Sequence, residues 1–376
     1  MAAVSEFSSR SALLFCHPSM ESLAQAIEQT CDTESTKAAL TPRDANLPIK
    51  TEVSPQSKKC FQTVEFRKTI QWESFNDGWP NLFIENVKEC AGRDVIFLGS
   101  FHSPEVIFEQ VSMLYTMPSY YPANHISREM DRQPLWERYL ARSFKFILPY
   151  FPTGTMERVD TEGQVVTAKT LAMLLSLIPS TARGPAQIVM YDIHCLQERF
   201  YFSDNIIPRL ETAIPLLHRE MSRLANEFDF KICIAFPDEG ACKRFQLLFS
   251  DFPLITCTKI RNGDKRIVQV KEGDPGGKHV IIVDDLVQTG GTLKNCAEAL
   301  LNKGAKTVSA FVTHAVFPKD SWKSFTTSKS KVPFKYFWIT DSIPHAVEIA
   351  KHAPFKLLSL CDSISHCLLG FDLLQS

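Results

Sequence analysis

Short apolar segments alternate with amphipathic segments along most of the 376-residue chain. Uninterrupted apolar runs predict buried strands, because a strand covered on both faces needs apolar residues on both. Segments with apolar residues every three or four positions predict helices between them. This alternation favours an α/β protein with mostly parallel, doubly wound sheets flanked by helices. The predicted strands are 95–98, 144–148, 188–191, 232–236 and 280–283, and the predicted helices include 104–114, 165–177 and 292–303.

The length predicts about two domains, since ordinary domains have on the order of 100–200 residues. Residues 30–59 are rich in Thr, Ser, Pro and Lys and lack apolar periodicity. We therefore expect a mobile N-terminal extension over residues 1–59. A first domain is predicted for 60–205, with a polar insertion at about 119–138, and a second for 206–376, beginning at a strand-to-helix crossover near Ile206-Ile207-Pro208.

The charge balance argues against a polyanionic partner. The 41 basic and 42 acidic residues nearly cancel, so nucleic-acid binding is not expected. No apolar run approaches the roughly 18 residues that a membrane span requires. Eleven cysteines without zinc-like spacing indicate free intracellular thiols. We expect a cytoplasmic protein; an organelle transit peptide is the alternative, favoured by Arg10 and early hydroxyl residues and opposed by Glu6, Glu21 and Glu28.

The most informative segment combines a strand, two acids, a glycine loop and a helix start. Its two adjacent glycines allow the backbone to approach an anion, and the N–H groups at a helix start bind phosphate. Asp284 and Asp285 precede the loop, where carboxylates can accept hydrogen bonds from the vicinal hydroxyls of a ribose. An ordinary turn with Thr292 as helix cap is the alternative. The predicted phosphate-binding residues are Gln288, Thr289, Gly290, Gly291 and Thr292.

Polar residues follow three further strand-like segments. Asp192 and His194 could ligate a divalent metal ion, although a lone histidine such as His194 is more often a core residue. Asp238 is a second metal candidate, with helix capping as its alternative. Lys259 and Arg261 lie in a basic loop that could stabilise phosphate charge or could be a solvated hairpin.

Together these segments resemble a known family. Residues 280–292 resemble the PRPP-binding loop shared by type I phosphoribosyltransferases and ribose-phosphate pyrophosphokinases. Asp192-Ile193-His194-Cys195-Leu196-Gln197 resembles the DLHxxQ loop of the pyrophosphokinases, and Pro149-Tyr150-Phe151-Pro152 their PYFP segment. The resemblance covers about Ile70 to Cys367 and implies two type I phosphoribosyltransferase-like domains. It also implies metal ligation by Asp192, His194, Asp204 and Asp238, and catalytic roles for His194, Lys259 and Arg261.

Two departures from the family pattern concern the nucleotide. Phe75 and Asp77 match an element that packs on adenine in a neighbouring subunit, but Trp79 replaces its glutamate. Thr155-Met156-Glu157 replaces an ATP-contacting Arg-Gln-Asp, a pattern similar to plant-type class II enzymes, which are loose in nucleotide choice. The resemblance still implies ATP-binding roles for Phe75, Asp77, Arg158 and Asp160.

The resemblance implies a Mg²⁺-dependent ribose-phosphate diphosphokinase. Such an enzyme transfers diphosphate from ATP, or from other nucleoside triphosphates, to O1 of ribose 5-phosphate and releases PRPP and AMP. A PRPP-consuming type I phosphoribosyltransferase and a non-catalytic regulatory homologue are the alternatives. The expected partners are these small molecules and further copies of the chain in a homo-oligomer, without nucleic acid or membrane.

Overall fold

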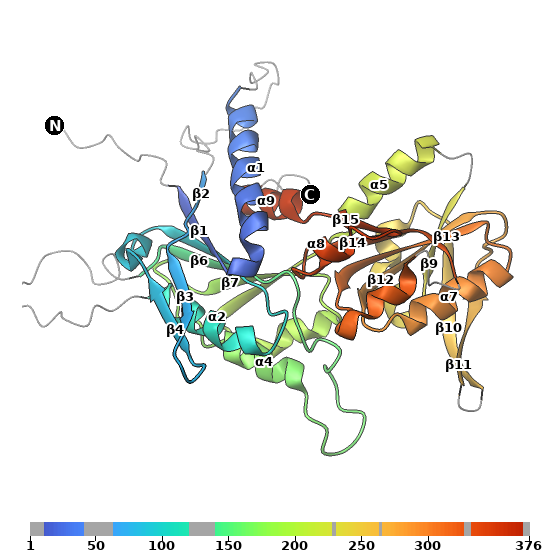
Figure 1. The fold of residues 1–376 in the computed structure, drawn as a ribbon, viewed down its shortest axis with the longest axis horizontal. Helices are drawn as coiled ribbons and strands as arrows, with labels where there is room; N and C mark the ends of the chain where they lie inside the picture. Colours follow the sequence, from blue (N-terminus) through green and yellow to red (C-terminus); the bar gives the residue numbers. More distant parts are fainter. Residues whose placement is uncertain are drawn as a thin grey trace, which may run out of the picture.

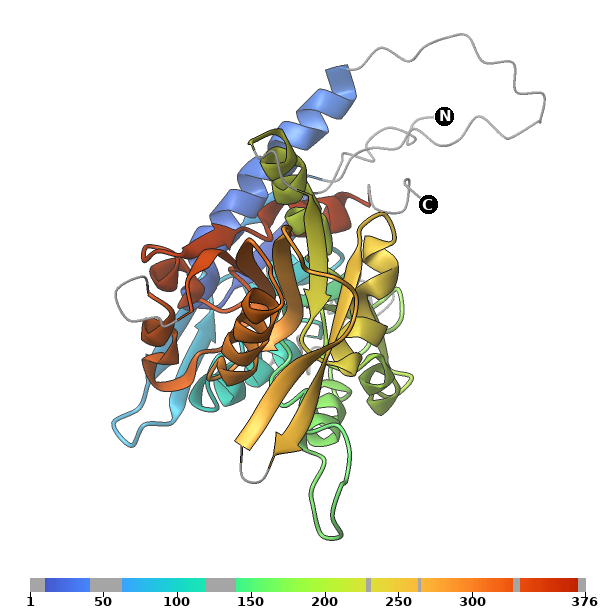
Figure 2. The ribbon, with the colours of Figure 1, turned by 90° about the vertical axis from the view of Figure 1, so that its right-hand side faces the viewer.

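The chain forms two sheets that lie side by side (Figure 1, Figure 2). The computed structural model describes residues 11–40, 63–119, 140–227, 231–262, 265–326 and 332–370. One sheet has six strands and the other seven, and a separate two-stranded sheet lies beside the first. Mostly parallel sheets with helices packed on them confirm the predicted fold class.

The six-stranded sheet has the order β2-β1-β5-β6-β7-β8, and all its neighbouring strands are parallel. Its strands are β1 (Ala12–Cys16), β2 (Val64–Phe66), β5 (Asp94–Leu98), β6 (Ser143–Ile147), β7 (Ala186–Tyr191) and β8 (Ile206–Glu211). The helices α1 (Glu21–Leu40), α2 (Glu105–Thr116) and α4 (Thr167–Leu175) belong to this half, with the 3₁₀ turns η1 (Pro18–Met20), η2 (Val87–Cys90) and η3 (Leu196–Tyr201). The antiparallel pair β3 (Ile70–Ser74) and β4 (Pro80–Ile84) forms the separate hairpin.

The seven-stranded sheet has the order β11-β10-β9-β12-β13-β14-β15, in which only β10 and β11 pair in antiparallel fashion. Its strands are β9 (Ile232–Phe236), β10 (Leu254–Asn262), β11 (Lys265–Glu272), β12 (His279–Val287), β13 (Thr307–Ala315), β14 (Phe334–Thr340) and β15 (Phe355–Leu358). The remaining elements are α5 (Ile214–Glu227), α6 (Glu239–Phe245), α7 (Gly291–Asn302), α8 (Ala346–Ile349), α9 (Cys361–Leu369), η4 (Gln246–Phe249) and η5 (Pro318–Phe325).

The structure differs from the predicted N-terminal extension over residues 1–59. Residues 12–16 form β1, which pairs with both β2 and β5 inside the first sheet. Helix α1 follows directly and buries Ile27 and Cys31. The expectation of a mobile segment is therefore wrong for residues 11–40, because a five-residue apolar run suffices for a central strand when its neighbours cover it.

The predicted boundary at residue 206 also needs a correction. Strand β8 begins there, but it pairs with β7 and so completes the first sheet rather than opening the second. The crossover into the second half is α5, which follows β8. The predicted insertion at about 119–138 lies, apart from Ser119, outside the described residues.

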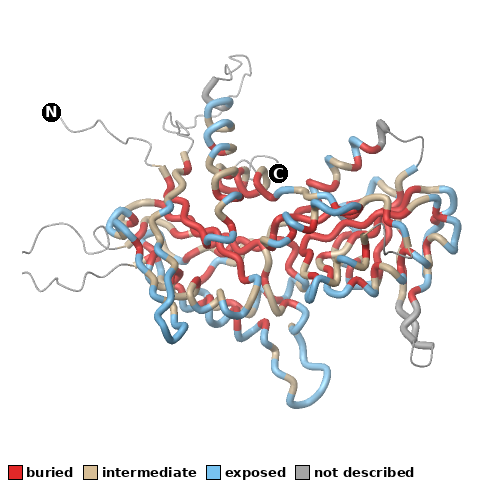
Figure 3. The backbone as a smooth tube through the Cα atoms, in the orientation of Figure 1, coloured by how far each residue is buried: buried red, intermediate tan, exposed pale blue. Residues whose placement is uncertain are grey.

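Burial is concentrated along the strands of both sheets (Figure 3). One apolar cluster contains residues from both halves, including Tyr191 of β7, Phe236 of β9 and Trp338 of β14. Because this cluster is shared, the two halves are packed together through apolar contacts. Within the described residues, no helix is long and apolar enough to cross a membrane.

Candidate active site

The strand order of the second sheet places a crevice between β9 and β12. From β9 the chain passes to β10 on one side and later returns to β12 on the other, so the loops after these two parallel neighbours diverge. Ligands of open parallel sheets bind at such switch points, beyond the carboxyl ends of the strands. Asp238 follows β9 and Asp284 lies near the end of β12, so both predicted acids lie at this crevice.

A cavity of about 1010 Å³ occupies this position and is lined by residues of both halves. The first half contributes the loop between β6 and α4 and the segment after β7. The second half contributes α6, the end of β12 and the start of α7. The predicted site residues that line it are Arg158, Asp160, His194, Asp238, Asp284, Asp285, Gln288, Thr289, Gly290, Gly291 and Thr292.

The glycine loop leaves the start of α7 open to an anion. Gly290 is the N-cap residue, with φ 80°, and no side chain caps the helix. The alternative interpretation, an ordinary turn with Thr292 as the helix cap, is thus wrong about the cap. A Cβ at Gly290 would lie 2.1 Å from Phe325, whereas one at Gly291 would meet no atom within 4 Å. Gly290 is therefore needed for conformation and packing, and the uncapped N–H groups that follow can bind phosphate.

The 3₁₀ segment η5 supports this loop from behind. The hydroxyl of Ser321 donates to the carbonyl oxygen of Gln288 at 3.1 Å. The ammonium of Lys294 donates to the hydroxyl of Ser324 at 2.6 Å and lies 4.3 Å from the ring centre of Phe325. These contacts fix α7 and the loop to a rigid neighbour, which sequence reasoning missed because η5 lies about thirty residues away in the chain and carries no local signal.

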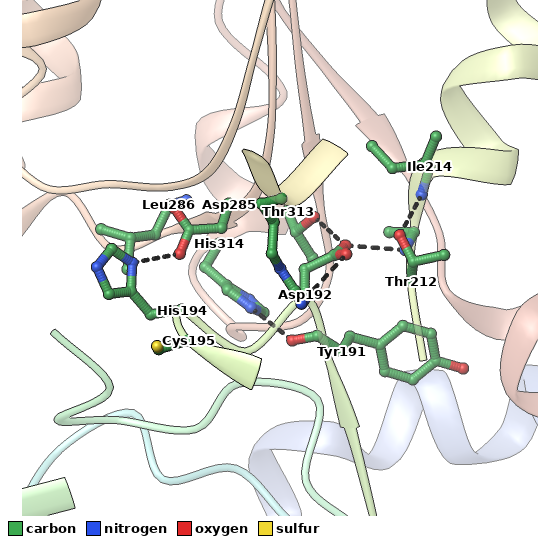
Figure 4. Close-up of polar contacts among 12 residues, drawn as sticks. Tyr191, Asp192, His194, Cys195, Thr212, Ile214, Asp285, Leu286, Thr313 and His314 are labelled. Carbon is green, nitrogen blue, oxygen red and sulfur yellow. Dashed lines mark hydrogen bonds and ion pairs between the residues drawn. The ribbon is translucent and has the colours of Figure 1, made fainter. Parts of the chain in front are cut away.

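The acidic pair lies near the end of β12, and both residues line the cavity. Burial and the adjacent Asp285 raise the pKa of Asp284 well above its usual value. Asp285 lies 2.6 Å from His194: its Oδ2 accepts from Nδ1 of the imidazole (Figure 4). This hydrogen bond raises the pKa of His194, although burial opposes the shift. The two sheets thus meet at the site through an acid from β12 and a histidine that follows β7.

Asp192 is buried, with 1% of its surface exposed, and does not line the cavity. Its φ of 36° lies in the left-handed region. Its Oδ2 accepts from the backbone N–H of Ala213 at 2.9 Å and from the hydroxyl of Thr313 at 2.6 Å (Figure 4). Nearby, Nε2 of His314 donates to the carbonyl oxygen of Tyr191 at 2.9 Å. The carboxylate therefore joins the end of β7 to both α5 and β13, two residues before His194.

The other predicted metal candidates have different surroundings. Asp238 caps α6 by accepting from the N–H of Ala241 at 3.0 Å, and it also lines the cavity. Asp238 therefore caps α6, which was the alternative considered for it, and it also has access to the site. Asp204 lies in an exposed turn and does not line the cavity.

The predicted nucleotide-binding residues are divided between two places. Arg158 and Asp160 form an exposed ion pair at 3.2 Å on the rim of the cavity. Phe75 and Asp77 lie in the turn between β3 and β4, where 55% of Phe75 is exposed. They do not line the cavity of their own chain.

The predicted cationic loop lies on the antiparallel ribbon of β10 and β11. Lys259 and Arg261 belong to β10, but their side chains lie outside the described part of the structure. The ribbon and the loop between β6 and α4 extend from the same side of the molecule (Figure 1, Figure 2). This arrangement puts the ribbon on the side where the loop residues Arg158 and Asp160 line the cavity.

Comparison with known proteins identifies the family. Residues 252–355 match the phosphoribosyl transferase domain. The chain is 50% identical over 305 residues to ribose-phosphate pyrophosphokinase 4 of Oryza sativa, a match that covers 80% of this chain and 87% of the relative. The chain belongs to the ribose-phosphate pyrophosphokinase family.

A second relative supports this assignment, and a solved structure supports the fold. Ribose-phosphate pyrophosphokinase 3, mitochondrial, of Spinacia oleracea is 48% identical over 305 residues, which cover 80% of this chain and 70% of the relative. The crystal structure of phosphoribosylpyrophosphate synthetase from Mycobacterium smegmatis superposes with a TM-score of 0.69 at 19% identity, covers 97% of this chain and 99% of its own, and supports the fold. The predicted resemblance to plant members and PRPP synthesis as the activity are confirmed, and neither alternative function is favoured.

The pyrophosphokinase cavity also contains residues that sequence reasoning did not select. Arg244 and Lys243 line it from α6, and Glu157 and Gln164 from the loop after β6. Glu198 lies buried beside it, and burial raises the pKa of this carboxyl group to about 8. Arg244 lies in the last turn of α6, and a basic residue there gave no signal, since such residues are common on solvated helix faces.

Proposed function

We propose that this pyrophosphokinase binds ribose 5-phosphate at the carboxyl end of β12 and MgATP across the interdomain cavity. The 5-phosphate lies on residues 288–292, and Asp284 and Asp285 accept hydrogen bonds from the ribose hydroxyls. His194 and Asp238 face the triphosphate together with its metal ion. Lys259 and Arg261 approach from the β10–β11 ribbon. The observation that carries this assignment is the uncapped start of α7, which opens into the same cavity as His194 and Asp285.

The proposed reaction is attack by the 1-hydroxyl oxygen of ribose 5-phosphate on the β-phosphorus. The bond between the β-phosphorus and the oxygen bridging to the α-phosphate breaks, AMP leaves with that oxygen, and the hydroxyl proton is released to solvent. Phosphoryl transfer of this kind depends on positioning and on neutralising charge. The phosphate loop and the acid pair position the substrate, and Lys259 and Arg261 neutralise the charge.

Magnesium is compatible with the chemistry of the cavity. The described residues contain no group of three or more His, Cys, Asp or Glu side chains that could hold a metal ion by themselves. Mg²⁺ commonly binds through one or two carboxylates, several waters and substrate phosphates. His194 and Asp238 line the cavity and would hold it, whereas Asp192 and Asp204 do not line it. When bound with ATP, the ion would neutralise phosphate charge. Burial and, after it, the neighbouring Asp285 raise the pKa of Asp284.

The nucleotide base is proposed to lie against a second copy of the chain. Phe75 and Asp77 lie on the exposed turn between β3 and β4, away from their own cavity. An aromatic ring can stack on a base, and a carboxylate can accept from an amino group. A homo-oligomer in which this turn reaches a neighbouring cavity follows from the proposal. Activity should then fall on dilution below the concentration needed for assembly, and a fully active monomer would contradict it.

A cytoplasmic location is likewise proposed, although three relatives are named mitochondrial or chloroplastic. Microscopy of the full chain carrying a C-terminal fluorescent tag tests the proposal directly. Fluorescence confined to an organelle would contradict the cytoplasmic location.

The test of the activity is phosphorus NMR of the purified protein with ribose 5-phosphate, magnesium and ATP, followed by GTP and CTP. Formation of AMP with PRPP is expected, and comparable turnover with the other nucleotides would support loose nucleotide choice. Binding of ribose 5-phosphate without any product would contradict the catalytic proposal and favour a regulatory role.

A further inference from the structure

Arg244 is a nearly buried cation in the wall of the cavity. Its side chain is 13% exposed, and it projects from α6, which begins directly after Asp238. Its Nε is buried without a hydrogen-bond partner among the described residues. Its guanidinium approaches Asp192 only to 3.9 Å, which is beyond hydrogen-bonding distance. A nearly buried guanidinium with an unsatisfied Nε–H donor is costly, so this arrangement is suited to a group that arrives from the cavity.

The other cations of the cavity wall have different environments. Arg158 is 73% exposed and pairs with Asp160 at 3.2 Å. Lys243 precedes Arg244 on α6 and is exposed. Among the described cavity residues, Arg244 is therefore the one cation that is held away from solvent and lacks a hydrogen bond. A bidentate guanidinium suits phosphate oxygens, and burial strengthens the attraction.

The position of Arg244 indicates which phosphate group it would bind. The 5-phosphate loop follows β12 and opens α7, whereas Arg244 lies on α6, after the neighbouring strand β9. Its guanidinium lies 3.9 Å from the carboxylate of Asp192, two residues before His194, so it faces the boundary between the two halves of the chain. A diphosphate that passes from a nucleotide in the first half to a ribose in the second must cross this boundary.

We propose that Arg244 binds the transferred diphosphate group of the nucleotide, and that Asp192 holds the guanidinium in place from behind. This inference rests on the proposed function and adds a binding residue to it. Arg244 contacts the β- and γ-phosphates, while Asp192 acts through Arg244 as a positioning residue. Ala213 and Thr313 occupy Oδ2 of Asp192, whereas its Oδ1, the oxygen nearer Arg244, is buried without a hydrogen-bond partner among the described residues. The proposal gives this oxygen a role.

The test compares ligands with and without the diphosphate. Calorimetry would measure binding of α,β-methylene-ATP and of AMP, both with magnesium, to the wild type, Arg244→Gln, Arg244→Lys and Arg219→Gln. Arg219 pairs with Asp362 on the surface and does not line the cavity, so its variant is the control. We expect Arg244→Gln to weaken binding of the triphosphate analogue by at least about tenfold, the loss of a charge-assisted hydrogen bond, and to leave AMP binding unchanged. Arg244→Lys should bind the analogue with intermediate affinity, and Arg219→Gln should resemble the wild type.

Two readouts separate binding from structure. Melting temperatures report whether loss of the contact with Asp192 destabilises the fold, and Arg244→Lys keeps a charge there if Arg244→Gln does not fold. Free guanidinium should restore part of the turnover of Arg244→Gln and leave the wild type unaffected. Equal weakening of AMP and the analogue, or unchanged analogue binding, would overturn the inference. If the wild type itself released no AMP, the proposed function would fail, and that outcome is distinguishable from failure at Arg244.

Discussion

The Nδ1 of His194 lies 2.6 Å from Oδ2 of Asp285, and this contact joins the end of a strand in the first sheet to an acid in the second. The acid is proposed to hold a ribose hydroxyl, and the histidine is proposed to face the triphosphate. The two substrates would therefore be bound by side chains that also bind one another. Such a contact can couple the occupancy of one subsite to binding at the other.

Replacing Asp285 by Asn should lower the pKa of His194, because Asp285 is the main cause of its elevation above 6.5. The ion pair stabilises the fold below about pH 6.5 and loses this effect as pH rises through the folded-state pKa. Histidine NMR titration of the ligand-free protein measures the shift. Asp284→Asn is the control, since no hydrogen bond links it to His194 among the described contacts. An unchanged pKa in Asp285→Asn would contradict the geometry.

Gly290→Ala should reduce ribose 5-phosphate affinity by about tenfold or more, because a non-glycine left-handed residue costs about 1–2 kcal/mol before any clash. The added methyl group would also lie 2.1 Å from Phe325. Calorimetry with ribose 5-phosphate provides the measurement. Gly277→Ala is a matched control, because Gly277 is also left-handed, its added methyl group meets no protein atom within 4 Å, and it does not line the cavity. If both variants bound like the wild type, the loop would not be the phosphate site.

Glu198→Gln should stabilise the protein at high pH. The pKa of this buried carboxyl group is raised to about 8, so its neutral form is favoured in the folded state. The folded protein consequently loses stability as pH rises from about 4.5 through 8, by on the order of a few kcal/mol. Melting temperatures at pH 5 and pH 9 should diverge between wild type and variant only at pH 9. A constant difference at both values would exclude titration of Glu198 as the cause.

Lys259→Ala should lower kcat by about 100-fold or more while the affinity for ribose 5-phosphate changes little, because the cation acts on charge that develops at the transferred group. Steady-state kinetics and calorimetry give the two quantities. Lys265→Ala, on the neighbouring strand of the same ribbon, is the control. Unchanged turnover in Lys259→Ala would remove this residue from catalysis.

Thr313→Val should destabilise the protein by about 1–3 kcal/mol, because it removes a buried donor from a carboxylate. The hydroxyl of Thr313 donates to Asp192 at 2.6 Å. Denaturant unfolding of Thr313→Val and Thr313→Ser gives the comparison, and the serine variant should keep most of the stability. Equal losses would assign the effect to packing of the methyl group instead.

The strand ends could be predicted because their signals are local. Ile232–Phe236 matches β9 residue for residue, and the glycine loop was identified from one continuous segment. Strand β1 could not be recognised, since its five apolar residues become a strand only between β2 and β5, which follow much later in the chain. The orientation of Asp192 likewise depends on Thr313, 121 residues away, and on a left-handed backbone conformation that an aspartate in the sequence does not predict.

The packing of α1 against α9 has a consequence for how the chain is made. The hydroxyl of Thr30 lies 3.3 Å from the thiol of Cys361, and Ile27 and Leu368 belong to the same apolar cluster. Helix α1 leaves the ribosome among the first elements, and α9 is the last helix of the described chain. The part of the apolar face of α1 that packs on α9 therefore stays exposed until α9 has been synthesised. Loss of α9 would leave this surface accessible to chaperones or prone to aggregation.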